Sequence, residues 1–128
     1  MAQQNFYYAD SNGNDFIIIF KDQLIVDLNT SMIKLLCKLK DKLADGLLLI
    51  DHNIKGYDFK MDYYNNDGTW ETMCVNGALS TINILQRMKF NFSYHCFKAG
   101  DGIHNIKFIN NQIYIKMITP KFKTNDIE

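Results

Sequence analysis

The chain has 128 residues, a length that holds one ordinary domain. Hydrophobic residues make up 47% of it, so it can bury a core, and its 14 basic and 14 acidic side chains cancel. A balanced charge disfavours a dedicated nucleic-acid or membrane-surface protein, which would need a basic face. No run approaches the ~20 apolar residues that cross a bilayer, and the start lacks a basic region followed by an apolar stretch. We therefore expect a cytoplasmic protein that binds neither nucleic acid nor membrane.

The first half of the chain predicts two buried strands with a helix between them. The continuous apolar runs at residues 16–20 and 47–50 are typical of buried strands. Thr30 or Ser31 can cap a helix that runs toward Leu43. Its apolar side chains recur at the spacing of one buried helical face: Met32, Leu35, Leu36, Leu39 and Leu43.

The second half predicts half-buried strands around a second helix. Residues 57–64 alternate between apolar and polar side chains, with Asp58 on the polar face, and residues 112–118 alternate in the same way. The second helix is expected from about Asn76 to Met88. Its predicted apolar stripe is Ala78, Leu79, Ile82 and Leu85. Together these elements predict an α+β fold, a mostly antiparallel sheet wrapped around one or two helices.

Metal and disulfide sites are disfavoured by the cysteine pattern. The three cysteines, Cys37, Cys74 and Cys96, are odd in number and lack Cys-x-x-Cys spacing. A calcium loop needs an Asp in its first position and a Gly in its sixth. Counting back from Gly68 puts Tyr63 in the first position, so that reading fails. We expect no metal.

Cys74 directly precedes the second predicted helix. The first N–H groups of a helix have no internal partner, and the helix dipole is positive there, so they can hold a carboxylate. The same field is expected to lower the pKa of a thiol. A thiolate beside an anion site suits removal of a proton from the carbon next to a bound carboxylate. The alternative is that Cys74 is a small buried apolar residue, which is our interpretation of Cys37 and Cys96.

Motifs in order along the chain resemble those of diaminopimelate epimerases. Residues 65–78 contain Asn-x-Asp-Gly and then Cys-Val-Asn-Gly-Ala, which is similar to the family's Cys-Gly-Asn-Gly-Ala. Residues 13–16 match its Gly-Asn-Asp-Phe, and residues 44–48 match its Ala-Asp-Gly-Leu-Leu. Residues 100–122 resemble its crossover region. The resemblance covers nearly the whole chain.

The resemblance implies two similar α+β domains that face each other across a cleft, each with one cysteine. One thiolate removes the proton from the substrate's α-carbon and the opposite thiol delivers another, without cofactor or metal. By motif match, Cys74 is the first cysteine of that pair. Substrate-binding roles are implied for two side-chain amides and for three backbone N–H groups at the helix start: Asn14, Asn65, Val75, Asn76 and Gly77. Taken alone, Asn14 and Asn65 are more typical of simple turns than of a binding site, but together with Cys74 they favour a site.

The sequence departs from the family pattern at several glycines. Val75 replaces the second residue of the cysteine signature, and a β-branched residue there disfavours positive φ and crowds a ligand that approaches the backbone. Further departures lie at residues 10–12, 41–43 and 79–80. The second cysteine motif of the family is absent.

We interpret residues 1–118 as an epimerase-like amino-terminal domain and residues 119–128 as an exit segment toward a missing second domain. The leading hypothesis is half of an epimerase that interconverts LL- and meso-diaminopimelate in lysine biosynthesis. Such a half binds an amino-acid substrate but is incomplete as a lone monomer, so it needs a second domain or a split subunit. The alternatives are a catalytically decayed binding domain with the same fold, and a homodimeric racemase for another amino acid.

Overall fold

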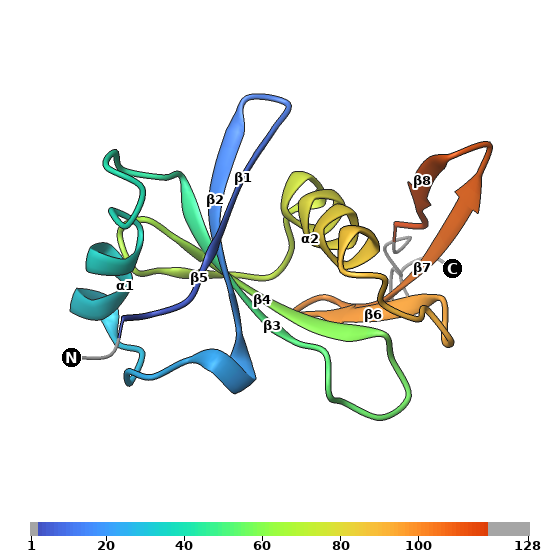
Figure 1. Cartoon of the computed structure of the whole chain (residues 1–128), viewed down its shortest axis with the longest axis horizontal. Coiled ribbons are helices and arrows are strands. Elements are labelled where there is room, and N and C mark those ends of the chain that lie inside the picture. The colour runs from blue at the N-terminus through green and yellow to red at the C-terminus, as the bar shows by residue number, and fades with distance from the viewer. Residues whose placement is uncertain (1–2, 118–128) are drawn as a thin grey trace, which may run out of the picture.

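The computed structural model describes residues 3–117. The predicted exit segment, residues 119–128, lies outside the described residues, so the predicted domain boundary stays a prediction. Strands and helices alternate along the chain (Figure 1). In order they are β1 (Tyr7–Ser11), β2 (Asn14–Phe20), a 3-10 turn η1 (Lys21–Gln23), α1 (Thr30–Leu36), β3 (Gly46–Asp51), β4 (Phe59–Asn65), β5 (Trp70–Glu71), α2 (Val75–Arg87), β6 (Cys96–Ala99), β7 (Gly102–Ile109) and β8 (Gln112–Ile115).

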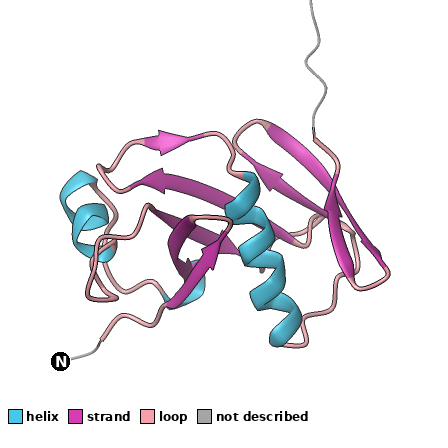
Figure 2. Cartoon of the chain, turned by 90° about the horizontal axis from the view of Figure 1, so that it is seen from above, coloured by secondary structure: helices cyan, strands magenta, loops and turns pink. Residues whose placement is uncertain are grey.

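The strands form one eight-stranded sheet in the order β1-β2-β3-β4-β6-β7-β8, with β5 paired to β4. The pairs β2–β3 and β4–β6 are parallel, and the other pairs are antiparallel. Helix α2 lies across one face of the sheet, while α1 lies near one end of the molecule (Figures 1 and 2). The predicted α+β class, with a mostly antiparallel sheet and two helices, is confirmed.

Both faces of the central strands are covered, which explains the continuous apolar run in β2. Because side chains alternate along a strand, Phe16 and Ile18 join the core beneath α2, whereas Ile17 and Ile19 join the core beside α1. The side chains of β3 alternate between the two cores in the same way, with Leu48 beneath α2 and Leu47 beside α1. Helix α2 buries Ala78, Ile82 and Leu85 from the predicted stripe, and Leu79 is half-buried.

Helix α1 is shorter than predicted and is capped by a different residue. The side-chain oxygen of Asn29 accepts the N–H of Met32 at 2.9 Å, so Asn29 is the cap in place of Thr30 or Ser31. The helix ends at Leu36, where the chain enters a series of turns.

The predicted buried face of this helix is confirmed in part. Leu36 is buried and Met32 is half-buried against the same core, but Leu35, Leu39 and Leu43 are 60%, 37% and 51% exposed. Leu39 and Leu43 lie outside the helix, so helical spacing does not apply to them, and within the helix the buried side chain is Ile33 in place of Leu35.

Asp58 is buried, with 2% of its surface exposed, although the alternating pattern assigned it to the polar face. Strand β4 begins one residue later, so Asp58 belongs to the preceding loop. Its carboxylate accepts the N–H of Tyr94 at 3.0 Å and the N–H of His95 at 2.8 Å, just before β6.

The last predicted strand ends earlier than expected, at Ile115, which leaves Met117 46% exposed.

Candidate active site

Three sequence-predicted residues meet at one end of the sheet, on the face that α2 covers. Asn14 begins β2 and shares a face with Phe16, which packs beneath α2. Asn65 ends β4 and shares a face with Tyr63, which packs against the same core. Cys74 also contacts this core, directly before α2 begins.

Cys74 occupies the cap position of α2 with an extended backbone, φ −143° and ψ 114°. The first helical hydrogen bond runs from the N–H of Ala78 to the carbonyl of Cys74 at 3.0 Å. The three preceding N–H groups, of Val75, Asn76 and Gly77, are therefore the unpaired ones that every helix start presents. These N–H groups and the adjacent thiol are the groups from which the sequence predicts an anion site.

Gly77 lets the start of α2 sit directly on β3. A Cβ at this position would lie 3.0 Å from Cδ2 of Leu48 and 3.5 Å from Cβ of Cys74. An added Cβ would fit only if the side chain of Leu48 moved by a few tenths of an ångström, so a small residue suits this contact between helix and sheet. The glycine that the motif match selected for its N–H thus also has a packing role.

Burial makes the thiol of Cys74 harder to ionise. Burial raises its pKa, the N–H groups of Gly77 and Asn76 lower it, and the charge of Asp45 raises it again, so that the net pKa lies above the ordinary value of 9.0. The expected lowering is therefore wrong, because desolvation outweighs the field of the helix start.

Val75 causes no backbone strain. It is the first residue of α2, and it is not among the positive-φ residues of the described chain. Its side chain is 40% exposed beside Cys74. The expected conflict with positive φ is therefore absent from the described residues, and what distinguishes this position from glycine is the added bulk.

A chain of side-chain amides ties α2 to the β1–β2 hairpin. Nδ2 of Asn12 donates to Oδ1 of Asn76 at 3.2 Å, and Nδ2 of Asn76 donates to Oδ1 of Asn14 at 2.7 Å. Asn14 in turn donates to Oδ2 of Asp45 at 3.4 Å. Asn12 has a φ of 51°, which is typical of a turn residue, and the sequence analysis assigned it no role in the site. Its link to Asn76 spans 64 residues and has no local signal in the sequence.

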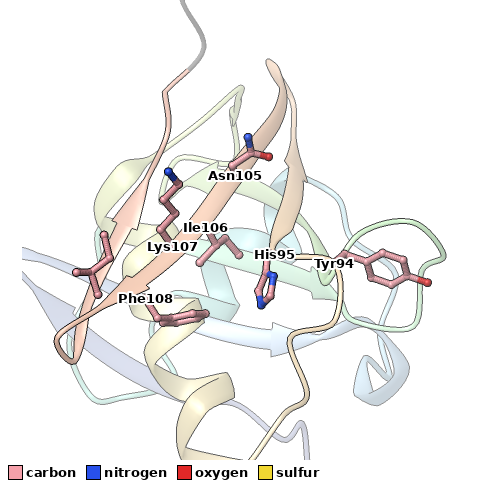
Figure 3. A pocket seen from close by; sticks show the side chains of 7 residues that line it. Tyr94, His95, Asn105, Ile106, Lys107 and Phe108 are labelled. Carbon is pink, nitrogen blue, oxygen red and sulfur yellow. The ribbon is translucent and has the colours of Figure 1, made fainter.

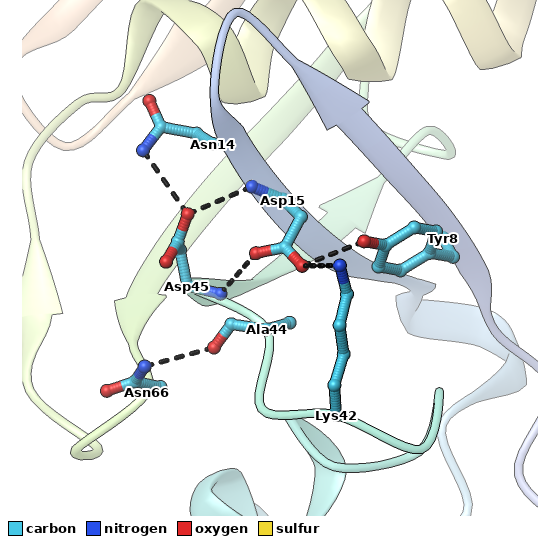
Figure 4. Close-up of polar contacts among 7 residues, drawn as sticks. All are labelled: Tyr8, Asn14, Asp15, Lys42, Ala44, Asp45 and Asn66. Carbon is cyan, nitrogen blue, oxygen red and sulfur yellow. Dashed lines mark hydrogen bonds and ion pairs between the residues drawn. The ribbon is translucent and has the colours of Figure 1, made fainter.

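Asp15 and Asp45, which belong to two of the matched motifs, hold each other in place (Figure 4). The N–H of Asp15 donates to Oδ2 of Asp45 at 3.0 Å, and the N–H of Asp45 donates to Oδ1 of Asp15 at 2.8 Å. The hydroxyl of Tyr8 donates to Oδ2 of Asp15 at 2.8 Å, and Nζ of Lys42 lies 3.5 Å from the same oxygen. These contacts fix the first residues of the parallel strands β2 and β3.

The side chain of Asn65 is held by the hairpin that follows β4. Its Nδ2 donates to Oγ1 of Thr69 and to Oε2 of Glu71, both at 3.0 Å. Asp67 closes the turn by accepting the N–H of Thr69 at 2.9 Å. Glu71 is a residue of the site that the sequence reasoning missed, since its place depends on the pairing of β5 with β4.

The relatives found by sequence are diaminopimelate epimerases. The enzyme of Flavobacterium psychrophilum is 37% identical over 109 residues, which are 84% of this chain and 42% of that protein. The enzyme of Chlorobaculum tepidum is 39% identical over 112 residues, which are 84% of this chain and 43% of that protein. That of Campylobacter jejuni subsp. doylei is 31% identical over 125 residues, 96% of this chain and 49% of that protein. The chain belongs to the diaminopimelate epimerase family.

The chain spans about half the length of the family members it matches. No model of a known protein family matches it. Among solved structures, a phenazine biosynthesis protein of the PhzF family from Bacillus anthracis aligns with a TM-score of 0.59 at 18% identity, over 86% of this chain and 38% of that one. A second such protein from Clostridium difficile has a TM-score of 0.62 at 13% identity, over 84% and 41%. These two structures share the epimerase-like fold.

A hollow of about 570 Å³ is lined by residues other than the predicted site residues (Figure 3). Its lining comes from β7 and the loop before β6: Tyr94, His95, Asn105, Ile106, Lys107, Phe108 and Ile109. Within residues 3–117 there is no group of three His, Cys, Asp or Glu residues that could hold a metal ion. The helices of that same part are too short or too polar to cross a membrane.

Proposed function

We propose that this chain supplies one half of an amino-acid epimerase that acts on diaminopimelate, in the cytoplasm and on the route to lysine. The observation that carries the proposal is the position of Cys74 at the cap of α2, next to the N–H groups of the helix start and two residues before Asn76, whose side chain donates to Asn14. The names of the sequence relatives support the substrate.

In this proposal the N–H groups of Val75, Asn76 and Gly77 bind the carboxylate of the amino acid, and Cys74 faces its α-carbon. The thiolate of Cys74 removes the α-proton, and the bound carboxylate together with the helix dipole holds the charge that develops. Once it has taken up the α-proton, Cys74 is a neutral thiol, and this thiol is the donor when the reaction runs in reverse.

Inversion needs a second proton donor on the opposite side of the α-carbon. A single thiol that removes and returns a proton on one face regenerates the starting configuration. We therefore propose that a second domain or a separate subunit provides the other acid/base group. A homodimer in which two copies of Cys74 face each other is the alternative arrangement, and it would suit another amino acid as well.

The binding-domain alternative is favoured by two observations. The pKa of the Cys74 thiol is raised, and the exposed Val75 side chain adds bulk where a ligand would approach the N–H groups. A domain of this kind would hold the amino acid without exchanging its α-proton.

The test is incubation with LL- and meso-diaminopimelate in deuterated water, followed by mass spectrometry of the α-position. The proposal expects deuterium uptake by the wild-type chain and by Cys96→Ser, and its loss in Cys74→Ala. Uptake without inversion would match a half-enzyme, and uptake with inversion would match a homodimer. Binding without uptake, even in the presence of a complementary carboxy-terminal epimerase domain, would replace the proposal with the binding-domain alternative.

A further inference from the structure

Glu71 stands on the same face of the sheet as Cys74. It lies directly opposite Tyr63 in the antiparallel β4–β5 pair, and opposite residues share a face. Tyr63 packs against the core beneath α2, which Cys74 also contacts. The neighbouring Trp70 points the other way, where its Nε1 donates to Oδ1 of Asp62 at 3.3 Å.

The hydrogen bonds of Asn65 leave an acceptor free. An amide nitrogen has two hydrogens, and Asn65 donates them to Thr69 and Glu71. What Asn65 still offers a ligand is therefore its carbonyl oxygen, next to the exposed carboxylate of Glu71. Among residues 3–117, no Lys, Arg or His forms an ion pair with Glu71.

Two carboxylates lie close to the phenol of Tyr63. Burial is the largest cause that raises the pKa of this phenol to about 12, and an ionised Cys74, Asp45 and Glu71 raise it further. The start of α2 nearby favours an anion instead. A ligand that fits both has a carboxylate for the helix start and a cation for Glu71.

We propose that the Glu71 carboxylate and the Asn65 carbonyl oxygen form a receptor for an ammonium group of the substrate, which makes Glu71 a specificity-determining residue. This inference rests on the proposed function in that the ligand is an amino acid. It deepens that function by naming the group that is recognised and the residue that recognises it.

The experiment compares two thiol reagents of similar size and opposite charge on Cys74, in a Cys96→Ser background. They are the cationic 2-aminoethyl and the anionic 2-sulfonatoethyl methanethiosulfonate, each corrected for its rate with a small free thiol. Labelling of the Cys74 peptide is followed by mass spectrometry at low salt. The wild-type ratio of cationic to anionic rate should exceed one and fall about threefold in Glu71→Gln, as expected for one charge at close range in a largely aqueous site.

The control is Asp27→Asn, which removes one exposed carboxylate outside the site and should leave the ratio unchanged. Glu71→Lys should reverse the preference, and it serves as the second variant if Glu71→Gln folds poorly by circular dichroism. Equal ratios in the wild-type chain, Glu71→Gln and Glu71→Lys would overturn the proposal. Because this readout needs no turnover, it is independent of whether the chain exchanges the α-proton of diaminopimelate.

Discussion

Asp15 and Asp45 each donate a backbone N–H to the other's carboxylate, at 3.0 and 2.8 Å. They precede the paired residues Phe16 and Gly46 at the start of two parallel strands. Parallel neighbours cannot be joined by a tight hairpin, and this exchange adds to the strand pairing that fixes their relative position. It therefore helps to position Asn14, which directly precedes Asp15.

Replacing Asp45 by Ala should lower the free energy of unfolding by about 2 to 3 kcal/mol, since the N–H of Asp15 and the amide of Asn14 lose their acceptor. Asp45→Asn keeps one carbonyl oxygen and should cost about half as much. Urea unfolding of the three proteins measures both values. Equal stability of Asp45→Ala and the wild-type chain would show that the exchange does not stabilise the fold.

Stability should fall in acid through Asp15. Burial raises its pKa, but the hydroxyl of Tyr8, the N–H of Asp45 and the ammonium of Lys42 together lower it further, so the net pKa is below 3.8. A carboxyl whose pKa is lower in the folded chain stabilises the fold above its unfolded value, and this contribution disappears as the pH falls through the folded value. Asp15→Asn should flatten the unfolding free energy between about pH 4 and pH 2. An unchanged slope in that variant would assign the acid sensitivity to other groups.

Gly46→Ala should be strongly destabilising, by about 2 to 3 kcal/mol. The new Cβ would overlap the ring of Tyr63 and lie 2.7 Å from the carbonyl oxygen of Tyr64, and a paired strand cannot move away. Gly56→Ala is the matched control, because among the described residues nothing lies within 4 Å of its Cβ position, although its φ is +92°. It should cost about 1 kcal/mol. Thermal unfolding of both variants distinguishes crowding from backbone strain.

The three thiols should react with iodoacetamide in an order set by burial. Burial, followed by the charge of Asp15, raises the pKa of Cys37 to about 11, so Cys37 should be alkylated last. The rate at Cys74 should continue to rise with pH beyond 9, because its thiol is also harder to ionise than usual. Peptide mapping over a pH series gives each profile. A Cys74 profile with its midpoint near pH 7 would mean that the helix start outweighs burial after all.

Asp58→Ala should lower the free energy of unfolding by about 3 kcal/mol, because the N–H groups of Tyr94 and His95 lose their acceptor in a partly buried loop. Asp58→Asn can accept one of these bonds and should recover part of the loss. Amide hydrogen exchange at His95 provides the local readout. Slow exchange at that amide in Asp58→Ala would indicate a different partner.

The sequence predicted the elements whose pattern is complete within a few residues. Helix α2 was located by its stripe and by the glycine and asparagine at its start, and β2 by its apolar run. The pattern around α1 was misleading because the leucines that follow the helix keep a helical spacing by chance. Ile33, which that pattern left out, is buried. The exposure predicted for Asp58 was wrong because a two-residue alternation does not reveal where the strand begins.

The sequence located some residues of the candidate site and missed others. Cys74, Asn14 and Asn65 were found through motifs that resemble a family, and the fold brings them to one end of the sheet. Asn12 and Glu71 were missed, because their roles depend on which strands pair and in which register. The pKa of the thiol was misjudged since burial is a property of the assembled core.

The amide chain that runs from Asn12 through Asn76 to Asn14 also has a kinetic consequence. One of its bonds joins residues that are 64 positions apart in the sequence, and the other joins residues that are 62 positions apart. Neither bond can form within a single hairpin or a single helix. The entropy of closing so long a loop is recovered only after the hairpin and α2 have both docked on the sheet. The surroundings of Cys74 should therefore be completed among the last events of folding, so that a partly folded chain carries a thiol but no site.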